Sequence, residues 1–407
     1  MQKAIVSNFR LTFAATMIKV EMKHWITICA CSALLLQACG QNAEGTKTET
    51  QTKERTVPQL PEIKHTYKLS DYLSENNDLD KDVEELFKTL DDTAIVAQLI
   101  MPAVGRLGNT PNSIEALINK RVIGGVLMLN GTKTEFTSWI TKFNELNEKN
   151  GNPGFLYSAD AEPSLFNRKI SGSSPVKKAN EITSLAEVNQ CADTIAATLK
   201  AIGINYNFAP VVDLAKNGTV GYRGFAKVEA NNVPWSNAFI ARMQEQGIIA
   251  TAKHFPGHGL VSGDTHKSLQ AIDGELKEIK TYPELIQKGV LSIMIGHLAV
   301  VNNPKYNTNG LPATCSKVIV TDLLRKELGF KGLVVTDAMN MGGVTAVKGN
   351  SVKAIEAGVD ILLMPLDCMR SHGEILAKYR SDAAFKAIVD SAAKRVIRMK
   401  LCAGAIK

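Results

Sequence analysis

Cysteine is scarce in this sequence of 407 residues, and its scarcity limits the kinds of fold that the chain can form. Four cysteines follow Cys39, and they are widely and irregularly spaced: Cys191, Cys315, Cys368 and Cys402. Disulfide scaffolds and zinc ribbons need closely and regularly spaced cysteines, so the pattern indicates neither. An oxidising compartment would still allow one or two disulfide bridges among these residues.

Strong net charge and basic runs are also missing. The formal charge is +7 at pH 7, and the four basic residues less the one acidic residue before Cys39 account for +3 of it. About +4 remains for the rest of the chain, in which no basic run carries interleaved aromatic residues. This balance gives no reason to expect nucleic acid as a partner.

The amino-terminal region lacks an apolar run that would span a bilayer comfortably. Its hydrophobic stretch, Trp25 to Leu36, follows the basic pair Lys23 and His24 and is separated from Cys39 only by Gln and Ala. A basic segment, a short apolar segment and a small residue before the cut are typical of a secretory signal. Residues 1–39 therefore resemble a bacterial lipoprotein signal with its lipobox, and an uncleaved membrane anchor is the alternative.

We accordingly expect Cys39 to be lipidated and to hold the protein on a bacterial membrane, facing the periplasm or the cell surface. Gly40 stands where an aspartate would favour the inner membrane of well-studied Gram-negative bacteria, so the outer membrane is favoured. Residues 40–65 are polar and lack apolar periodicity, which predicts a disordered tether. Residues 66–407 have an ordinary globular composition and are expected to form a monomer.

Apolar runs alternate with helical patterns through the remaining chain without an obvious interdomain linker. Such alternation predicts a parallel sheet in which each crossover is a helix. Close to eight such units favour a (β/α)8 TIM barrel in a single catalytic domain, and an open doubly wound sheet is the alternative. We expect strands at 99–102, 124–129, 154–160, 204–212, 247–254, 291–297, 333–337 and 358–365. We expect helices at 82–98, 113–119, 134–149, 185–202, 235–246, 276–288, 316–328 and 352–357.

The chemistry is concentrated between Lys253 and His266, where fourteen residues include three histidines and three glycines. Lys253 and His254 close an apolar strand, and the proline and glycines that follow predict a mobile loop. At its far end Asp264 and His266 are two residues apart. From that spacing a carboxylate could orient an imidazole and raise its basicity.

Polar side chains also terminate four other apolar runs. They are Asp160, Asp213, His297 and Asp337. Because the carboxyl ends of parallel strands meet at one face of a barrel, we expect these residues to converge there with Lys253 and His254. A carboxylate in the position of Asp337 needs hydrogen bonds or positive charge to stay ionised, which Lys253, Arg168 and Arg223 could supply. A helix N-cap is the structural alternative for Asp337.

These residues resemble glycoside hydrolase family 3, and within it the single-domain bacterial β-N-acetylglucosaminidases of peptidoglycan recycling. The similarity covers roughly 90–403. The segment Lys253 to Gly259, followed after four residues by Asp264-Thr265-His266, is similar to the signature of that subgroup, with Thr where Ser is more usual. The segment Val334 to Met339 is similar to the nucleophile segment of the family. Further landmarks match at 207–213, 221–225, 312–314 and 357–360.

The resemblance implies a retaining exo-β-N-acetylhexosaminidase that needs no cofactor or metal. Asp337 would be the nucleophile that forms a covalent glycosyl-enzyme. His266, paired with Asp264, would protonate the leaving oxygen and then activate water. A retaining mechanism needs one ionised carboxylate and one group that gives and takes a proton near neutrality, which histidine can do. The carbohydrate partner would be a glycan that contains N-acetylglucosamine, such as peptidoglycan fragments.

By the same resemblance, five residues would grip the terminal sugar: Asp160, Arg168, Arg223, Lys253 and His254. His258 would shape the loop, and His297 would form a wall or a hydrogen bond. One departure concerns the family pattern D-x-E-G-G-x-V-x-R, in which Pro163 and Ser164 replace both glycines. The replacement removes backbone freedom beside Asp160 but keeps the spacing to Arg168, so it bears on the pocket shape and on the sugar preference.

Other functions stay open at the level of sequence. A barrel metal hydrolase could use His254, His258, Asp264 and His266 as ligands, although Lys253 next to His254 would repel a cation. A glycan-binding lipoprotein could have kept the barrel without catalysis, although both expected catalytic residues are present. A family 3 β-glucosidase, and phosphate in place of water as the acceptor, are further alternatives.

Overall fold

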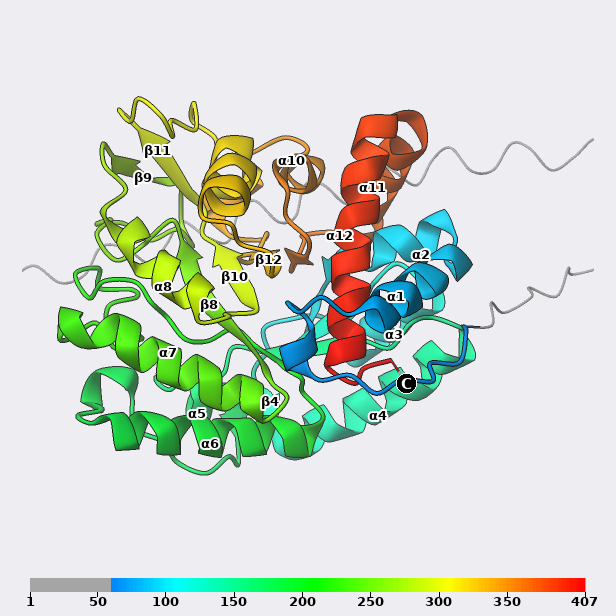
Figure 1. Cartoon of the computed structure of the whole chain (residues 1–407), viewed down its shortest axis with the longest axis horizontal. Coiled ribbons are helices and arrows are strands. Elements are labelled where there is room, and N and C mark those ends of the chain that lie inside the picture. The colour runs from blue at the N-terminus through cyan, green and yellow to red at the C-terminus, as the bar shows by residue number, and fades with distance from the viewer. Residues whose placement is uncertain (1–59, 407) are drawn as a thin grey trace, which may run out of the picture. The chain divides into compact units, whose positions relative to one another are not determined.

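Parallel strands alternate with helices in the computed structural model, which describes residues 60–406 (Figure 1). The predicted signal segment 1–39 with Cys39, and the tether as far as residue 59, lie outside the described residues. The described residues belong to one compact unit, which extends from Thr56 to Lys407. None of its helices is both long enough and apolar enough to cross a membrane.

The central sheet contains seven parallel strands in the order β12-β10-β8-β7-β5-β3-β2. Their bounds are β2 Ala103–Val104, β3 Gly125–Met128, β5 Leu156–Ala159, β7 Tyr206–Asn207, β8 Ile249–Phe255, β10 Ser292–Ile295 and β12 Leu333–Thr336. Each lies within or beside an apolar run that the sequence predicts. Every residue of these seven strands is buried, as expected where helices cover a parallel sheet.

The two ends of this sheet approach a separate pair of strands. β1 (Ile100–Met101) pairs with β13 (Leu362–Leu363) in parallel register, and Pro102 alone separates β1 from β2. A bridge between Val335 and Ile361 joins β12 to the residues just before β13. The chain therefore has an α/β fold whose parallel sheet curls into a half-barrel, which agrees with the predicted α/β class. Two more parallel pairs lie outside the sheet: β4 (Gly131–Thr132) with β6 (Ile170–Ser171), and β9 (Gln270–Asp273) with β11 (Leu298–Val301).

The helices follow the predicted order with shifted ends. They are α1 Asn77–Thr89, α2 Asp92–Ala97, α3 Pro111–Asn119, α4 Lys133–Lys149, α5 Phe166–Lys169, α6 Leu185–Ile202, α7 Glu229–Glu245, α8 Tyr282–Gln287, α9 Gly342–Thr345, α10 Asn350–Ala357, α11 Cys368–Ser381 and α12 Ala383–Cys402, with a π-helix at Val318–Glu327. Short 3₁₀ turns lie at Leu69–Asp71, Ala179–Glu181, Lys277–Thr281 and Ala313–Cys315.

Two predicted helix bounds are wrong for local reasons. The predicted helix 82–98 is two helices, because the Asp91 side chain accepts a hydrogen bond from Ala94 N and caps a new start. The helix predicted at 235–246 begins at Glu229 instead, and Pro234 lies inside it. By contrast α6 has the predicted bounds, since Ser184 caps its first turn and Gly203 follows its end at φ 96°.

The carboxyl-terminal helix α12 lies beside α1, far away in the sequence (Figure 1). Lys394 pairs with Glu84 at 2.5 Å, and Arg398 pairs with Asp80. The region predicted as the end of the tether also contacts the body: Leu60 and Ile63 pack on the core, and His65 lies 3.1 Å from Asp82. Part of the segment expected as the tether, from Leu60 on, therefore packs on the folded body.

Candidate active site

The polar residues at the strand ends come together where the parallel register places them. Asp160 directly follows β5, Lys253 and His254 lie near the end of β8, and Asp337 directly follows β12. Lys253 Nζ lies 2.6 Å from Asp160 Oδ1, although 93 residues separate the two in sequence. The carboxyl ends of the strands thus form one polar site, as the sequence predicts.

A buried charge cluster occupies one side of this site. Lys253, which is 1% exposed, contacts Asp160 and lies 3.0 Å from Glu162 Oε2. Arg223 makes two hydrogen bonds to Glu162, at 2.5 and 3.0 Å. Burial alone would lower the pKa of Lys253, but the charges of Asp160 and Glu162 raise it above its ordinary value. The lysine therefore stays protonated inside the protein.

The carboxylates of the cluster are held ionised by the same contacts. Burial would raise the pKa of Asp160, but Lys253, Lys169 and Arg223 bring it well below its ordinary value. Burial likewise opposes the ionisation of Glu162, and Arg223 with Lys253 lowers its pKa. Such fixed charges suit hydrogen bonding to sugar hydroxyls, because bonds to charged groups are stronger than bonds between neutral ones.

Glu162 is a site residue that the sequence analysis did not select. It is completely buried and joins the two cations Arg223 and Lys253. The signal was present, since Glu162 is the acidic third residue of the D-x-E pattern that begins at Asp160. Its role is to hold the two cations in place, which the pattern alone does not reveal.

Arg168 is not part of the buried charge cluster. Its side chain is exposed, and no hydrogen bond or ion pair joins it to any other residue within 60–406. Instead Lys169 reaches Asp160, with Nζ 3.3 Å from Oδ2. Consecutive residues of a helix point about 100° apart, so on α5 only one of these two can face the site. Nearby, Ser164 Oγ bonds the Tyr222 carbonyl and the Ala179 amide, which fixes the turn before α5.

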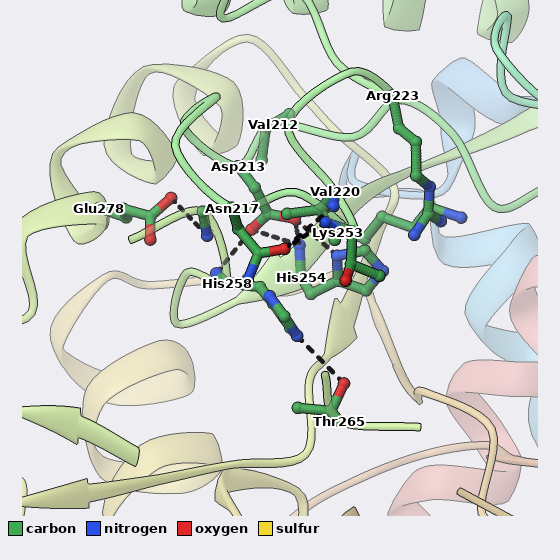
Figure 2. Close-up of polar contacts among 12 residues, drawn as sticks. Val212, Asp213, Asn217, Val220, Arg223, Lys253, His254, His258, Thr265 and Glu278 are labelled. Atoms are coloured by element: carbon green, nitrogen blue, oxygen red, sulfur yellow. Dashed lines mark hydrogen bonds and ion pairs between the residues drawn. The ribbon is translucent and has the colours of Figure 1, made fainter. Parts of the chain in front are cut away.

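Asp213 organises the centre of the site (Figure 2). It is fully buried and accepts three hydrogen bonds: from the His254 amide, from His254 Nδ1 at 2.6 Å and from the His258 amide at 2.8 Å. Burial would raise the pKa of Asp213, but His254 and these donors lower it. The ionised carboxylate therefore fixes the tautomer of His254, leaving Nε2 for another partner.

Asp337 has the properties of a nucleophile. It is partly exposed, its Oδ1 accepts the Ala338 amide at 2.8 Å, and its own amide donates to Ile295 O. Burial would raise the pKa of Asp337, but the adjacent His254 and the Ala338 amide are among the influences that lower it. The helix-cap alternative does not apply. The backbone amide that donates to the Asp337 side chain belongs to the next residue, Ala338, which lies outside α9.

Asp264 and His266 form the predicted pair. His266 Nδ1 lies 2.7 Å from Asp264 Oδ1, and the same oxygen accepts the His266 amide. Burial would raise the pKa of Asp264, but these two bonds lower it. The His266 side chain is 60% exposed, so its free Nε2 is open to a substrate. An oriented, accessible imidazole can transfer protons.

His297 is buried and supports the segment that carries Asp337. Its Nε2 donates to the Ala338 carbonyl at 3.0 Å, and its Nδ1 lies 2.8 Å from Thr314 Oγ1. Burial lowers the pKa of His297, so the ring is neutral, and one nitrogen donates while the other accepts. This geometry agrees with the hydrogen-bonding role expected of His297.

Three of the four side chains that a metal hydrolase could use have other partners. His254 Nδ1 bonds to Asp213, His266 Nδ1 bonds to Asp264, and His258 Nε2 lies 3.1 Å from Thr265 Oγ1. Across residues 60–406, no group of three or more His, Cys, Asp or Glu residues has the geometry to hold a metal ion.

Known proteins are similar to this chain in sequence and in fold. The model of the glycosyl hydrolase family 3 N terminal domain matches residues 89–399. A β-hexosaminidase of Psychromonas ingrahamii is 34% identical over 210 residues, which cover 49% of this chain and 60% of that protein. The chain thus spans less than two thirds of the length of this curated relative.

Two solved structures resemble the fold at a similar level of identity. A β-N-acetylhexosaminidase from Beutenbergia cavernae matches with a TM-score of 0.68 and 28% identity, over 75% of this chain and 97% of that one. A glycoside hydrolase family 3 β-N-acetylglucosaminidase from Paenibacillus sp. str. FPU-7 matches with a TM-score of 0.71 and 26% identity, over 78% of this chain and 63% of that one.

Proposed function

The chain belongs to glycosyl hydrolase family 3, and we propose on that premise that it is a retaining exo-β-N-acetylhexosaminidase. One observation carries the proposal: an ionised, accessible Asp337 and an accessible Asp264–His266 pair belong to segments that are hydrogen-bonded to each other. The Gly342 amide, five residues after Asp337, donates to the His266 carbonyl at 3.0 Å. A retaining glycosidase needs such a nucleophile next to such a proton donor.

The two groups divide the reaction into two displacements. In the first, a carboxylate oxygen of Asp337 bonds to the anomeric carbon while His266 gives its proton to the departing glycosidic oxygen. In the second, His266 takes a proton from water, and the water oxygen displaces Asp337 to release the free sugar. Two inversions at the anomeric carbon give net retention. Asp264 keeps His266 Nε2 directed at the leaving oxygen by holding Nδ1.

For the sugar we propose N-acetylglucosamine at the β-linked non-reducing end of peptidoglycan fragments or related glycans. The names of the similar proteins from Psychromonas, Beutenbergia and Paenibacillus support an N-acetylhexosamine. Asp160, Lys253, Arg223 and His254 supply charged or oriented polar groups beside Asp337. Lys169 takes the place that the sequence had given to Arg168.

We also propose that the curled sheet closes into a complete eight-stranded (β/α)8 barrel. The pairing of β1 with β13 and the bridge between Val335 and Ile361 support closure on one side. On the other side, the Gly124 amide donates to Ile100 O and the Leu127 amide donates to Pro102 O, which ties the β1–β2 segment to β3.

For the location we propose a lipid anchor on Cys39 that holds the enzyme on a bacterial membrane, with the outer membrane favoured. The support is the sequence before Gly40, which resembles a lipoprotein signal. Fractionation of native cells tests this, together with a Cys39→Ser variant. Recovery of most wild-type protein in the cytoplasmic fraction would refute the proposal.

The activity is tested with paired substrates and paired variants. Initial rates on an aryl β-N-acetylglucosaminide and an aryl β-glucoside are measured for wild type, Asp337→Ala and the surface control Asp78→Ala. We expect turnover of the acetamido sugar only, with a loss of at least about 10³-fold in Asp337→Ala and no change in the control. Preference for the glucoside would indicate a β-glucosidase, and binding without turnover a glycan-binding protein. A sugar phosphate as product would identify phosphate as the acceptor.

A further inference from the structure

The loop between β8 and β9, residues 256–269, is tied to the body of the protein at several places. At its root, Glu278 accepts the Gly259 amide at 3.2 Å and the Leu260 amide at 3.1 Å, while Asp213 accepts the His258 amide. Glu278 also accepts the Leu214 amide at 2.7 Å, so one carboxylate joins this loop to the loop after β7. These contacts fix the root but not the far end with His266.

Asn217 anchors the middle of the loop. Its Nδ2 donates to the Val261 carbonyl and, at 3.1 Å, to the Gly263 carbonyl. Its Oδ1 accepts the Thr219 and Val220 amides, which fixes the orientation of the side-chain amide. Figure 2 shows Asn217 with its contact to the Val220 amide. Because Asn217 is only 4% exposed, these four bonds do not compete with bulk water.

The far end is held by two consecutive backbone amides. Gly342 N donates to the His266 carbonyl, and Gly343 N donates to the Thr265 carbonyl, both at 3.0 Å. Thr265 Oγ1 also lies 3.1 Å from His258 Nε2, which joins the far end of the loop to its root. The catalytic pair is therefore positioned through its own backbone by the segment that begins with Asp337.

Only glycine permits this close approach. A Cβ on Gly342 would overlap the carbonyl of Lys267, and a Cβ on Gly343 would lie 2.8 Å from His297 Cβ and 3.1 Å from the Thr265 carbonyl. Both residues lie at the start of α9. Within a helix, alanine is normally more stable than glycine by about 0.5–1 kcal/mol. Space for the loop, rather than the needs of the helix, therefore explains the two glycines.

We propose that Gly342 and Gly343 are positioning residues that seat the catalytic loop on the nucleophile segment, with Asn217 as the second anchor. The two bonds from the Gly342 and Gly343 amides, called the seat below, set the distance between His266 and Asp337. Acid and base assistance is therefore available only while these bonds hold the loop. This inference rests on the proposed glycosidase function, because it states that the seat brings the proton donor His266 to the substrate.

The test compares wild type with Gly342→Ala, Asn217→Ala and His266→Ala. Gly218→Ala is the matched control, since Gly218 adjoins Asn217 and a Cβ there would have no neighbour within 4 Å. Each protein is assayed on phenyl and dinitrophenyl β-N-acetylglucosaminides. The phenolate needs a proton to leave and the dinitrophenolate does not, so the pair of substrates separates lost acid assistance from general damage.

We expect Gly342→Ala to lose about 10²-fold in kcat/KM on the phenyl substrate and little on the dinitrophenyl substrate, as His266→Ala does. On the dinitrophenyl substrate kcat should still fall, because water needs the base in the second displacement. Azide attacks without a general base, so it should restore this kcat and give the glycosyl azide. Asn217→Ala should show a smaller loss of the same kind, and Gly218→Ala none. Wild-type rates in Gly342→Ala, or equal losses on both substrates with a lower Tm, would overturn the proposal.

Hydrogen exchange of the full-length protein keeps the two proposals distinguishable. If the loop is seated on Gly342 and Gly343, the amides of residues 258–269 exchange faster in Gly342→Ala than in Gly218→Ala. An inactive wild type with this exchange pattern would refute the glycosidase while leaving the seat in place. Unchanged exchange in Gly342→Ala would refute the seat, whether or not the wild type is active.

Discussion

Two buried lysines at opposite ends of the strands differ in the charge they carry. Lys253, at the carboxyl ends, touches two carboxylates, and its pKa is raised. Lys400 is 0% exposed, and among residues 60–406 its side chain bonds only the neutral Gln98, at 2.6 Å, near the amino ends of β1 and β5. Burial lowers the pKa of Lys400 to about 7. Burial by itself therefore brings the pKa of Lys400 down to near neutrality, whereas the carboxylates of Asp160 and Glu162 keep Lys253 charged.

The comparison shows what distinguishes the candidate active site from the rest of the interior. At the carboxyl ends, Asp160 and Glu162 maintain Lys253 and Arg223 as fixed cations. At the amino ends no carboxylate in the described part of the chain pairs with Lys400, which packs beside the ring of Phe155. A charged side chain is useful for holding a sugar, whereas the lysine at the amino ends only has to fill space.

The largest effect is expected when the charged lysine is removed. Lys253→Met leaves Glu162 buried with Arg223 as its only cation, and breaking a buried charge cluster costs about 3–5 kcal/mol. We expect the free energy of unfolding in urea to fall by that amount and kcat/KM on the aryl N-acetylglucosaminide to fall at least about 10²-fold. Lys326, 68% exposed, provides the control Lys326→Met, which should change unfolding by less than about 0.5 kcal/mol. Equal stability of the two variants would contradict the cluster.

A stabilising effect is expected at the other lysine. In Lys400→Met with Gln98→Leu, the two side chains that bond each other both become apolar, and the Ala94 carbonyl loses the bond that Gln98 Nε2 donates at 2.9 Å. We expect a gain of about 1–4 kcal/mol at neutral pH, by analogy with buried ion pairs replaced by apolar groups. Activity should stay unchanged, because neither residue lies at the candidate site.

The gain in stability should depend on pH, and the pKa values of Lys400 in the folded and unfolded states give the direction of the change. The unfolded lysine titrates at its ordinary 10.5 and the folded one at about 7, so between these values the unfolded state binds the extra proton. Wild-type stability therefore contains a contribution that is present above about pH 10.5 and is lost as the pH falls towards 7. The advantage of the double variant over wild type, measured by urea unfolding, should shrink as the pH rises from 7 to 10. A constant advantage would show that Lys400 does not change protonation on unfolding.

The site residues at the carboxyl ends of the strands can be predicted well from the sequence, whereas residues that act through buried partners cannot. The strands were predictable because runs such as Leu333 to Val335 are wholly apolar, and their ends then locate Asp337 and Lys253. The pair Asp264 and His266 was predictable because its two members are local in sequence. Glu162 and Lys400 were missed, since their importance depends on burial and on partners such as Arg223, which no local pattern encodes.

The smallest effect is expected where the sequence misplaced a cation. Lys169 is 13% exposed at the side chain and adds a second cation to Asp160, whereas Arg168 is exposed. Partly exposed pairs contribute about 1 kcal/mol or less, so Lys169→Met should lower kcat/KM by about 5-fold or less, mainly through KM, with little change in Tm. Arg168→Met is the matched control on the same helix and should stay within about 2-fold of wild type. A larger loss in Arg168→Met than in Lys169→Met would show that Arg168 turns inward when the sugar binds. Pro163 and Ser164 would then leave the family arrangement intact despite the contact between Lys169 and Asp160.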